Sequence, residues 1–334
     1  MSDTNPATIW IKNPLAIFAQ DSDSGVVIKG QKIIELVPLS AKPKSQIDEV
    51  YDASGSVLLP GLINTHHHFY QTLTRAYPEA LNKELFPWLK SLYKVWANIQ
   101  PEMLAVSTEL ALSELLLSGC TTASDHHYLF PSQLENAIDI QVEEAQKIGM
   151  RVTLTRGSMS LGEKDGGLPP QSVVQTKEKI LTDSERLIKA YHESEEGAMT
   201  QIALAPCSPF SVTTDLMIET SELAQHYDVR LHTHLAETID EENFCLDKFG
   251  LRTVDYLESV GWLSDRTWLA HGIHFNQQEI QKLGDFGVGI CHCPSSNMML
   301  ASGICHSLEL EEAGSTIGLG VDGSASNDGS NMIA

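Results

Sequence analysis

Three consecutive histidines follow an apolar run near the start of the chain. His66, His67 and His68 follow two residues after the apolar run Val57–Ile63, which is predicted to form a β-strand. Side chains alternate between the two faces of a strand, so His66 and His68 point one way and His67 points the other. Two imidazoles spaced in this way can bind one metal ion, and imidazole suits zinc. An isolated pair is more often the polar end of a strand, so the rest of the chain must decide.

Histidine and acidic residues recur after three further predicted strands that lie far apart in the sequence. If these strands belong to one barrel, their carboxyl ends meet at the same face and their polar residues surround one centre. Such a convergence is more specific than any single motif. The residues in question are His66, His68, His234, Glu237, His271 and Asp322.

The ligand chemistry of these residues predicts a metal centre. Three imidazoles (His66, His68 and His234) and the carboxylate of Asp322 can hold one divalent cation, with a water completing the shell. Such a cation lowers the pKa of its water to around 7. No lysine occupies a strand end where it could bridge a second ion, so we expect one ion per chain.

Two further residues are candidates for proton transfer. Glu237 lies just past His234 and is expected to be a general acid and base that also contacts the substrate. His271 is expected to orient the attacking oxygen and to stabilise the charge that develops on the tetrahedral intermediate. His271 and Asp322 are both expected to assist removal of the proton of the water.

Other polar residues at strand ends have weaker assignments. Cys207 ends the fourth barrel strand and is expected to line the pocket, and Arg156 ends the third and is expected to face the substrate. His126 and His127 end the second strand and either line the pocket or cap the strand. His232 is expected to be a packed interior residue rather than a ligand.

The elements that would position these residues alternate between strands and helices. From Leu62 onward eight β-runs are separated by helical runs such as 132–148, which implies a (β/α)8 TIM-type barrel over residues 58–334. A doubly wound open sheet is the alternative, but no glycine-rich phosphate loop follows any strand. Residues 1–57 contain short strands and glycine turns, and they predict a small β module before the barrel.

The chain ends at Ala334, directly after the eighth predicted strand and its loop. A closed barrel normally needs a last helix to cover that strand. We therefore expect the final helix and the rest of the C-terminal part to be missing from this chain or to be supplied otherwise.

Composition narrows the classes of function and location. The formal net charge is −22, which opposes binding to nucleic acid or to an anionic membrane surface. The N-terminus has no basic and apolar segments typical of a secretory signal, and no apolar run approaches the length of a membrane span. Six cysteines scattered through a long chain are typical of reduced thiols. A cytoplasmic enzyme is the expectation.

At these motifs the sequence resembles the amidohydrolase superfamily, in its cytosine/guanine deaminase and chlorotriazine-hydrolase branch. The resemblance covers essentially the whole chain and implies zinc on the four predicted ligands, with Glu237 and His271 in the roles given above. It also implies that Gln71 reaches the substrate ring. The motifs that carry it are Pro60–His68, His232–Glu237, Leu269–Gly272 and Val321–Asp328.

The resemblance also implies a reaction. It is the hydrolytic deamination of an amino-substituted purine, with 8-oxoguanine, converted to urate and ammonia, as the expected substrate. Guanine, a pterin or a triazine are alternatives on the same fold, and Fe²⁺ or Mn²⁺ are alternatives to Zn²⁺ because the same ligands accept several metals. A homo-oligomer is a family-based expectation. A hypothesis of another class is a non-catalytic barrel scaffold, against which the intact set of site residues argues.

Overall fold

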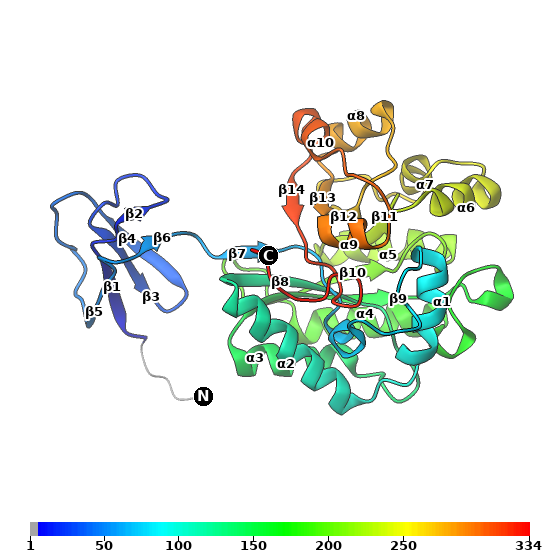
Figure 1. Cartoon of the computed structure of the whole chain (residues 1–334), viewed down its shortest axis with the longest axis horizontal. Coiled ribbons are helices and arrows are strands. Elements are labelled where there is room, and N and C mark those ends of the chain that lie inside the picture. The colour runs from blue at the N-terminus through cyan, green and yellow to red at the C-terminus, as the bar shows by residue number, and fades with distance from the viewer. Residues whose placement is uncertain (1–5) are drawn as a thin grey trace. The chain divides into compact units, whose positions relative to one another are not determined.

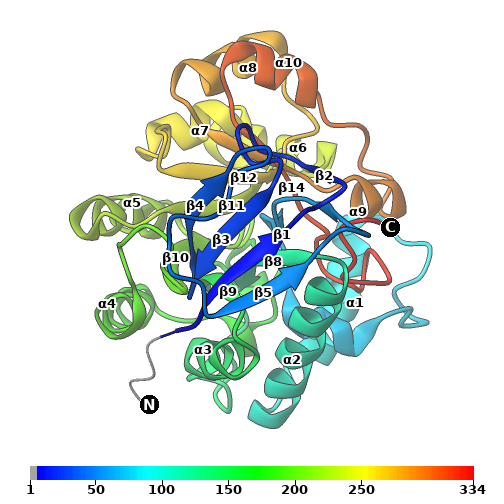
Figure 2. The ribbon, with the colours of Figure 1, turned by 90° about the vertical axis from the view of Figure 1, so that its left-hand side faces the viewer.

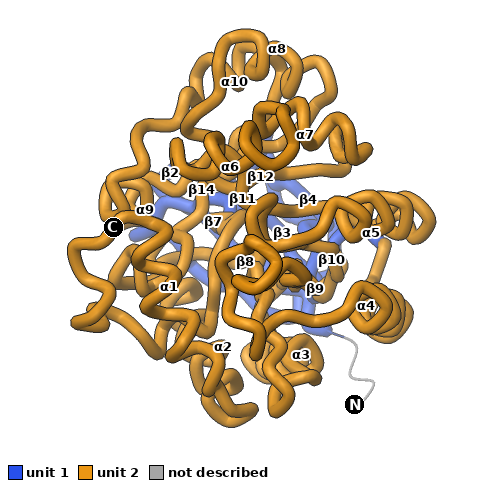
Figure 3. Tube along the Cα trace, turned by 90° about the vertical axis from the view of Figure 1, so that its right-hand side faces the viewer, with its two compact units in different colours: residues 1–61, 195–197 blue, residues 62–194, 198–334 orange. Residues whose placement is uncertain are grey.

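The computed structural model describes residues 6–334, and these form two compact units (Figures 1 and 3). The first unit takes in the chain up to Gly61 together with Glu195–Gly197. The second unit takes in Leu62–Ser194 and Ala198–Ala334. The domain boundary predicted between residues 57 and 58 stays a prediction.

The first unit is a small β module. Its four-stranded sheet has the order β4-β3-β1-β5 (Figure 2), and a separate two-stranded sheet pairs β2 with β6. Strands β4 and β5 do not show the usual alternation of buried and exposed side chains, because most of their residues are exposed. The strands are β1 (Thr8–Lys12), β2 (Ala16–Ile17), β3 (Gly25–Lys29), β4 (Lys32–Val37), β5 (Glu49–Asp52) and β6 (Val57–Leu58).

The second unit is a closed barrel of eight strands. The order around the barrel is β7-β8-β9-β10-β11-β12-β13-β14, and every neighbouring pair is parallel. This confirms the predicted (β/α)8 barrel and its N-terminal β module. The strands are β7 (Leu62–Asn64), β8 (Cys120–His127), β9 (Arg151–Ser158), β10 (Thr200–Pro206), β11 (Leu231–Leu235), β12 (Thr267–His271), β13 (Gly289–His292) and β14 (Ile317–Leu319).

Helices surround this barrel (Figure 3). None of them, within residues 6–334, is long and apolar enough to cross a membrane. Three short 3₁₀ helices, η1 (Phe69–Thr74), η2 (Glu163–Asp165) and η3 (Gln171–Val173), lie in the connections. The α-helices are α1 (Leu85–Trp96), α2 (Pro101–Leu117), α3 (Ala137–Ile148), α4 (Lys177–Tyr191), α5 (Thr214–Tyr227), α6 (Ile239–Phe249), α7 (Thr253–Ser259), α8 (Gln277–Asp285), α9 (Pro294–Met299) and α10 (Ser307–Ala313).

Local signals in the sequence explain where several helices begin and end. Helix α2 begins with Pro101. Proline has no backbone N–H, and an N–H in the first turn would have no partner within the helix, so nothing is lost there. Helix α8 begins with a capping box in which Asn276 and Glu279 satisfy each other's backbone groups. Helices α3 and α6 end at Gly149 and Gly250, both in the left-handed conformation that glycine adopts without a steric penalty.

Several elements differ from the prediction, and three of them have a local explanation. The apolar run Val57–Ile63 is not one strand, because Pro60 and Gly61 separate β6 in the first unit from β7 in the barrel. Helix α3 begins at Ala137 rather than at residue 132, after a turn that starts at Pro131. Helix α9 was not predicted, because its six residues are too few to show helical periodicity.

Candidate active site

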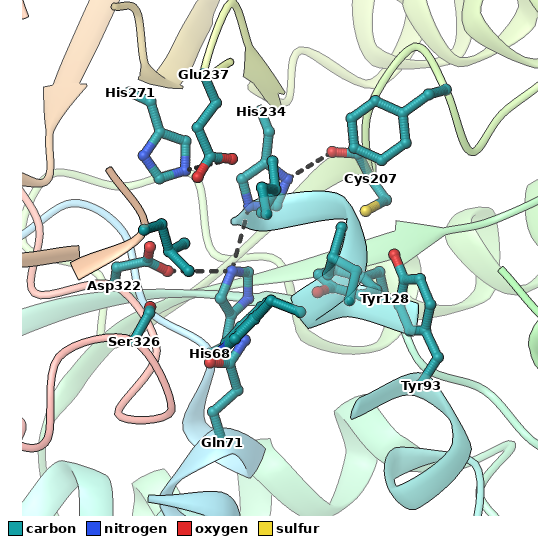
Figure 4. A pocket seen from close by; sticks show the side chains of 15 residues that line it. His68, Gln71, Tyr93, Tyr128, Cys207, His234, Glu237, His271, Asp322 and Ser326 are labelled. Atoms are coloured by element: carbon teal, nitrogen blue, oxygen red, sulfur yellow. Dashed lines mark hydrogen bonds and ion pairs between the residues drawn. The ribbon is translucent and has the colours of Figure 1, made fainter. Parts of the chain in front are cut away.

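The four predicted metal ligands lie together at the carboxyl ends of the barrel strands. His68 Nε2 lies 3.2 Å from His234 Nε2. Asp322 Oδ1 lies 3.4 Å from His66 Nε2 and 3.3 Å from His68 Nε2. All four side chains are buried, and Figure 4 shows His68, His234 and Asp322 directed at one another.

The outer nitrogens of two of these imidazoles bind backbone carbonyls. His68 Nδ1 lies 2.7 Å from the carbonyl of His126, and His234 Nδ1 lies 2.7 Å from the carbonyl of Cys207. A carbonyl oxygen can only accept, so Nδ1 carries the proton in each ring. The Nε2 atom of each ring therefore presents a lone pair to the centre, which is how metal-binding histidines are held.

His66 is oriented through a second histidine. His232 Nδ1 donates to the carbonyl of Trp268 at 2.9 Å, so His232 Nε2 is an acceptor. It lies 2.8 Å from His66 Nδ1, which must then donate. His66 Nε2 is left with a lone pair, like the other two ligands. As expected, His232 is a packed interior residue, and its ring stacks on Trp268. Its contact with His66 was not expected. The signal in the sequence was its position two residues before His234, which places both side chains on the same face of the strand.

A divalent cation fits this cluster of atoms. Three unprotonated nitrogens and a carboxylate oxygen face one another with no proton between them, and His66 Nε2 is buried without a hydrogen-bond partner among residues 6–334. Burial lowers the pKa of His68 to about 3, so its ring stays neutral and available as a ligand. His126 also lies close, but its Nε2 donates to the carbonyl of Ala205 at 3.0 Å.

Glu237 and His271 face each other beside the cluster (Figure 4). Glu237 Oε2 lies 3.4 Å from His271 Nε2, and both side chains are buried. Burial, reinforced by the charges of Asp322 and Glu241, raises the pKa of Glu237 well above its ordinary value. Burial lowers the pKa of His271 to about 4. A carboxyl group whose pKa is raised in this way is suited to general acid and base catalysis.

Three residues at the ends of barrel strands have a left-handed backbone although they are not glycines. They are Ala236 after β11 (φ 51°), His271 at the end of β12 (φ 76°) and Asp322 after β14 (φ 59°). This conformation is unfavourable for residues with a Cβ atom, and buried residues that adopt it cluster at functional sites. It turns the chain sharply at the points where Glu237, His271 and Asp322 enter the site.

The backbone of Glu237 is held by an acidic residue that we had not singled out. Glu241 lies in the first turn of α6, and its Oε2 accepts a hydrogen bond from the Glu237 N–H at 3.0 Å. The side chain is buried, and burial raises its pKa to about 8. The run of three acidic residues at the start of α6, Asp240–Glu242, was the signal in the sequence.

A cavity opens beside the metal-ligand cluster. Gln71 and Cys207, both expected to contact the substrate, line it together with Tyr93 and Tyr128 (Figure 4). The Gln71 Oε1 and Tyr93 Oη atoms are buried and have no hydrogen-bond partner within the described chain. Tyr93 was not predicted, because an aromatic residue on a helix is usually a core residue.

The structure places Arg156 away from this cavity, so the expectation that it faces the substrate is wrong. Its guanidinium lies on the outer side of the barrel, stacked 3.7 Å from the ring centre of Phe130. There it donates to Asp183 at 2.7 Å and to Gln175 at 2.8 Å. The reason is strand alternation. Arg156 pairs in register with His127, and both side chains take the face of the sheet opposite to His126.

His67 and His127 also point away from the cluster. His67 Nε2 lies 2.9 Å from the hydroxyl of Ser330, and His127 Nε2 donates to the carbonyl of Leu129 at 2.7 Å. For His67 this agrees with the alternation argument, even though β7 ends before the histidines at Asn64.

Asp125 anchors the segment that follows the histidines. Its Oδ1 accepts the backbone N–H of Phe69 at 2.6 Å, and its Oδ2 accepts from Gln141 Nε2 at 2.6 Å. The carboxyl group thereby holds the start of η1, the 3₁₀ helix that carries Gln71. Burial raises the pKa of Asp125 to about 7.

Stability should therefore depend on pH through Asp125. Between its unfolded pKa of about 4 and its folded pKa, the folded protein keeps a proton that the unfolded chain has lost, so the free energy of unfolding falls as pH rises. We expect this fall to be steeper in the wild type than in Asp125→Asn, by up to about 1.4 kcal/mol per pH unit between pH 4 and 7. Urea denaturation at several pH values measures both slopes.

Asp125→Asn can keep both hydrogen bonds, because Gln141 Oε1 has no partner among residues 6–334 and the amide can turn. Asp165→Asn, at an exposed position in η2, is the matched control and should follow the wild-type slope. Equal slopes for Asp125→Asn and the wild type would contradict the assignment.

Comparison with known proteins gives one family. The family model described as "Amidohydrolase family" matches residues 57–334. The 8-oxoguanine deaminase of Pseudomonas aeruginosa is 65% identical to the chain over 327 residues, which are 97% of this chain and 73% of that protein. An isoxanthopterin deaminase from an unknown prokaryotic organism is 33% identical over an alignment of 346 positions, which covers 99% of this chain and 71% of that protein.

Solved structures agree with the sequence relatives. The crystal structure of an atrazine chlorohydrolase from Arthrobacter aurescens TC1, complexed with zinc, superposes with a TM-score of 0.90 at 32% identity. The match covers 97% of this chain and 74% of that one. The fold is thus shared with an enzyme that was crystallised with zinc.

Proposed function

The chain belongs to the amidohydrolase family, and we propose that it is a metal-dependent deaminase that converts 8-oxoguanine and water to urate and ammonia. The observation that carries the choice of substrate is the 65% identity, over 97% of this chain, to a protein named 8-oxoguanine deaminase. The arrangement of Glu237 and His271 beside the ligand cluster supports the hydrolytic chemistry.

The proposed cofactor is one divalent cation per chain, held by His66, His68, His234 and Asp322. Bound there, it would supply Lewis acidity and activate a water at neutral pH. We propose Zn²⁺ because three imidazoles and one carboxylate suit it and because a relative at 32% identity was crystallised with zinc. The ring nitrogens away from the cluster are already bonded to partners, so the ligands need no rearrangement.

The residues of the chain then move the protons. Glu237 accepts one proton from the attacking water and delivers it to a ring nitrogen. The second proton of the water, which Asp322 helps to remove, then passes to the leaving amino group. A C–O bond forms at the amino-bearing carbon, the C–N bond breaks, and ammonia leaves. His271 stabilises the oxygen on which negative charge develops, and Asp322 helps to remove the water's proton.

Gln71 and Cys207 are the proposed substrate contacts. Both line the cavity, and Gln71 has a buried amide oxygen with no partner among the described residues. A ring amino or N–H group of a purine would supply the missing donor, and an analogue without it would leave the amide unsatisfied. A cytoplasmic location and a homo-oligomer belong to this proposal as well, on the strength of the family resemblance.

The substrate is tested by a panel of four compounds with the zinc-loaded protein. We expect kcat/KM for 8-oxoguanine to exceed that for guanine, isoxanthopterin and an amino-triazine by at least about tenfold, because the pocket's polar groups match one ring best. Urate is followed by its absorbance and ammonia by a coupled assay. Faster turnover of another member of the panel would replace 8-oxoguanine as the substrate.

A further inference from the structure

Helix α9 places two consecutive side chains against the active site. The hydroxyl of Ser296 donates to Asp322 Oδ2 at 2.6 Å. The next residue, Asn297, has its Nδ2 atom 3.0 Å from His271 Nδ1. Both side chains are buried. Neither faces the cavity, so each can act only through the residue that it touches.

The contact of Asn297 determines which nitrogen of His271 carries the proton. An amide nitrogen can only donate, so His271 Nδ1 accepts and the single proton of the neutral ring lies on Nε2. Nε2 is the atom that faces Glu237, at 3.4 Å. With the opposite tautomer, Nε2 would present a lone pair to the place where His271 has to donate.

We propose that Asn297 is a positioning residue that fixes the tautomer of His271, so that its Nε2–H is a permanent donor to the reacting oxygen. The inference rests on the proposed function, which gives His271 that role. It also explains why a polar amide is buried here with its Oδ1 atom unpaired among residues 6–334. Its hydrogen bond to His271 is the one that the side chain makes in the described structure.

The backbone of Asn297 is anchored independently of the side chain. Its N–H donates to the carbonyl of Cys293 at 3.0 Å, and its own carbonyl accepts from the Ser302 N–H at 2.9 Å. A substitution of the side chain should therefore leave α9 in place. This makes the role of the side chain separable from the fold of the segment.

Two substitutions distinguish tautomer control from packing. Asn297→Asp keeps the shape but replaces the donor with an acceptor, which pulls the proton of His271 to Nδ1. Asn297→Ala removes the donor and leaves the tautomer free. We expect Asn297→Asp to lower kcat by about 100-fold or more with KM and bound metal little changed, and Asn297→Ala to lower it less. If the side chain of Asn297 only fills space, Asn297→Ala will lower kcat more than Asn297→Asp does, and that result would overturn the proposal.

The chain offers a matched control for the same chemical change. Asn276 caps α8 with its Oδ1, which accepts from the N–H groups of Gln278 and Glu279. Asp makes the same cap, so Asn276→Asp should keep kcat within about twofold of the wild type. It adds the same negative charge as Asn297→Asp, at an exposed position.

A spectroscopic readout tests the tautomer without any turnover. In ¹⁵N-histidine-labelled, zinc-loaded protein, the His271 ring is assigned by comparison with His271→Gln. We expect the proton on Nε2 in the wild type and on Nδ1 in Asn297→Asp. A wild-type ring protonated on Nδ1 would overturn the proposal, and this spectrum decides the matter even if Asn297→Asp does not fold. Failure of the substrate panel with the expected tautomer present would reject the proposed substrate alone.

Discussion

Glu237→Gln is expected to lower kcat for deamination by about a thousandfold while leaving the bound metal unchanged. Gln has nearly the same shape as Glu but cannot take a proton from water and pass it to the ring. The backbone of the residue stays in place, because Glu241 accepts its N–H. Steady-state kinetics on 8-oxoguanine and metal analysis of the same preparation measure the two quantities.

The control for this variant is Glu163→Gln, the same substitution at an exposed position in η2, which should behave as the wild type. A loss of metal from Glu237→Gln would show that the residue is a ligand rather than a proton carrier. A decrease of less than about tenfold would remove Glu237 from proton transfer altogether, because positioned acids and bases contribute 100-fold or more.

His68→Asn is expected to empty the metal centre. His68 Nε2 lies within 3.3 Å of both His234 Nε2 and Asp322 Oδ1, so its loss removes a ligand next to two others. We expect bound metal to fall from about one ion per chain to almost none, with activity lost in parallel. The rise in melting temperature that added zinc should give the wild type would also disappear, because a ligand that binds only the folded state stabilises it.

The neighbouring histidine supplies the control. His67→Asn changes the same residue type one position away, where the ring faces Ser330 instead of the cluster. It should keep its metal and most of its activity. Loss of metal from both variants, or retention by His68→Asn, would contradict the assignment of ligands. A wild-type protein that binds no metal when supplied with zinc would revive the scaffold hypothesis.

The barrel could be predicted because strands and helices repeat along the sequence, and the ligand cluster could be predicted because metal-binding residue types follow several of the strands. Strand and helix repeats are long enough to count, and His66, His68, His234 and Asp322 follow strands whose ends must meet in a barrel. Strand alternation even separates His67 from its neighbours. These inferences need only the chain's own pattern and the geometry of parallel strands.

The supporting residues could not be predicted because their roles depend on contacts between distant segments. Asn297 lies on a helix of six residues that shows no period, and it meets His271 across 26 positions. Glu241 is one of three adjacent acids, and only the structure shows which one turns back to Glu237. Arg156 was misplaced because β9 continues to Ser158, so Arg156 lies within the strand and its side chain alternates to the outer face of the barrel.

Backbone dihedrals offer a way to find this site without any knowledge of its side chains. Among residues 6–334, eleven residues other than glycine have the left-handed conformation, and eight of these are exposed residues of turns and loops. The three that are buried are Ala236, His271 and Asp322. A buried residue does not lie in an exposed turn that would favour this conformation, so the packing around the residue must impose it. In barrels of uncertain function, a search for buried left-handed residues at strand ends is thus a test for catalytic machinery that is independent of motif and of homology.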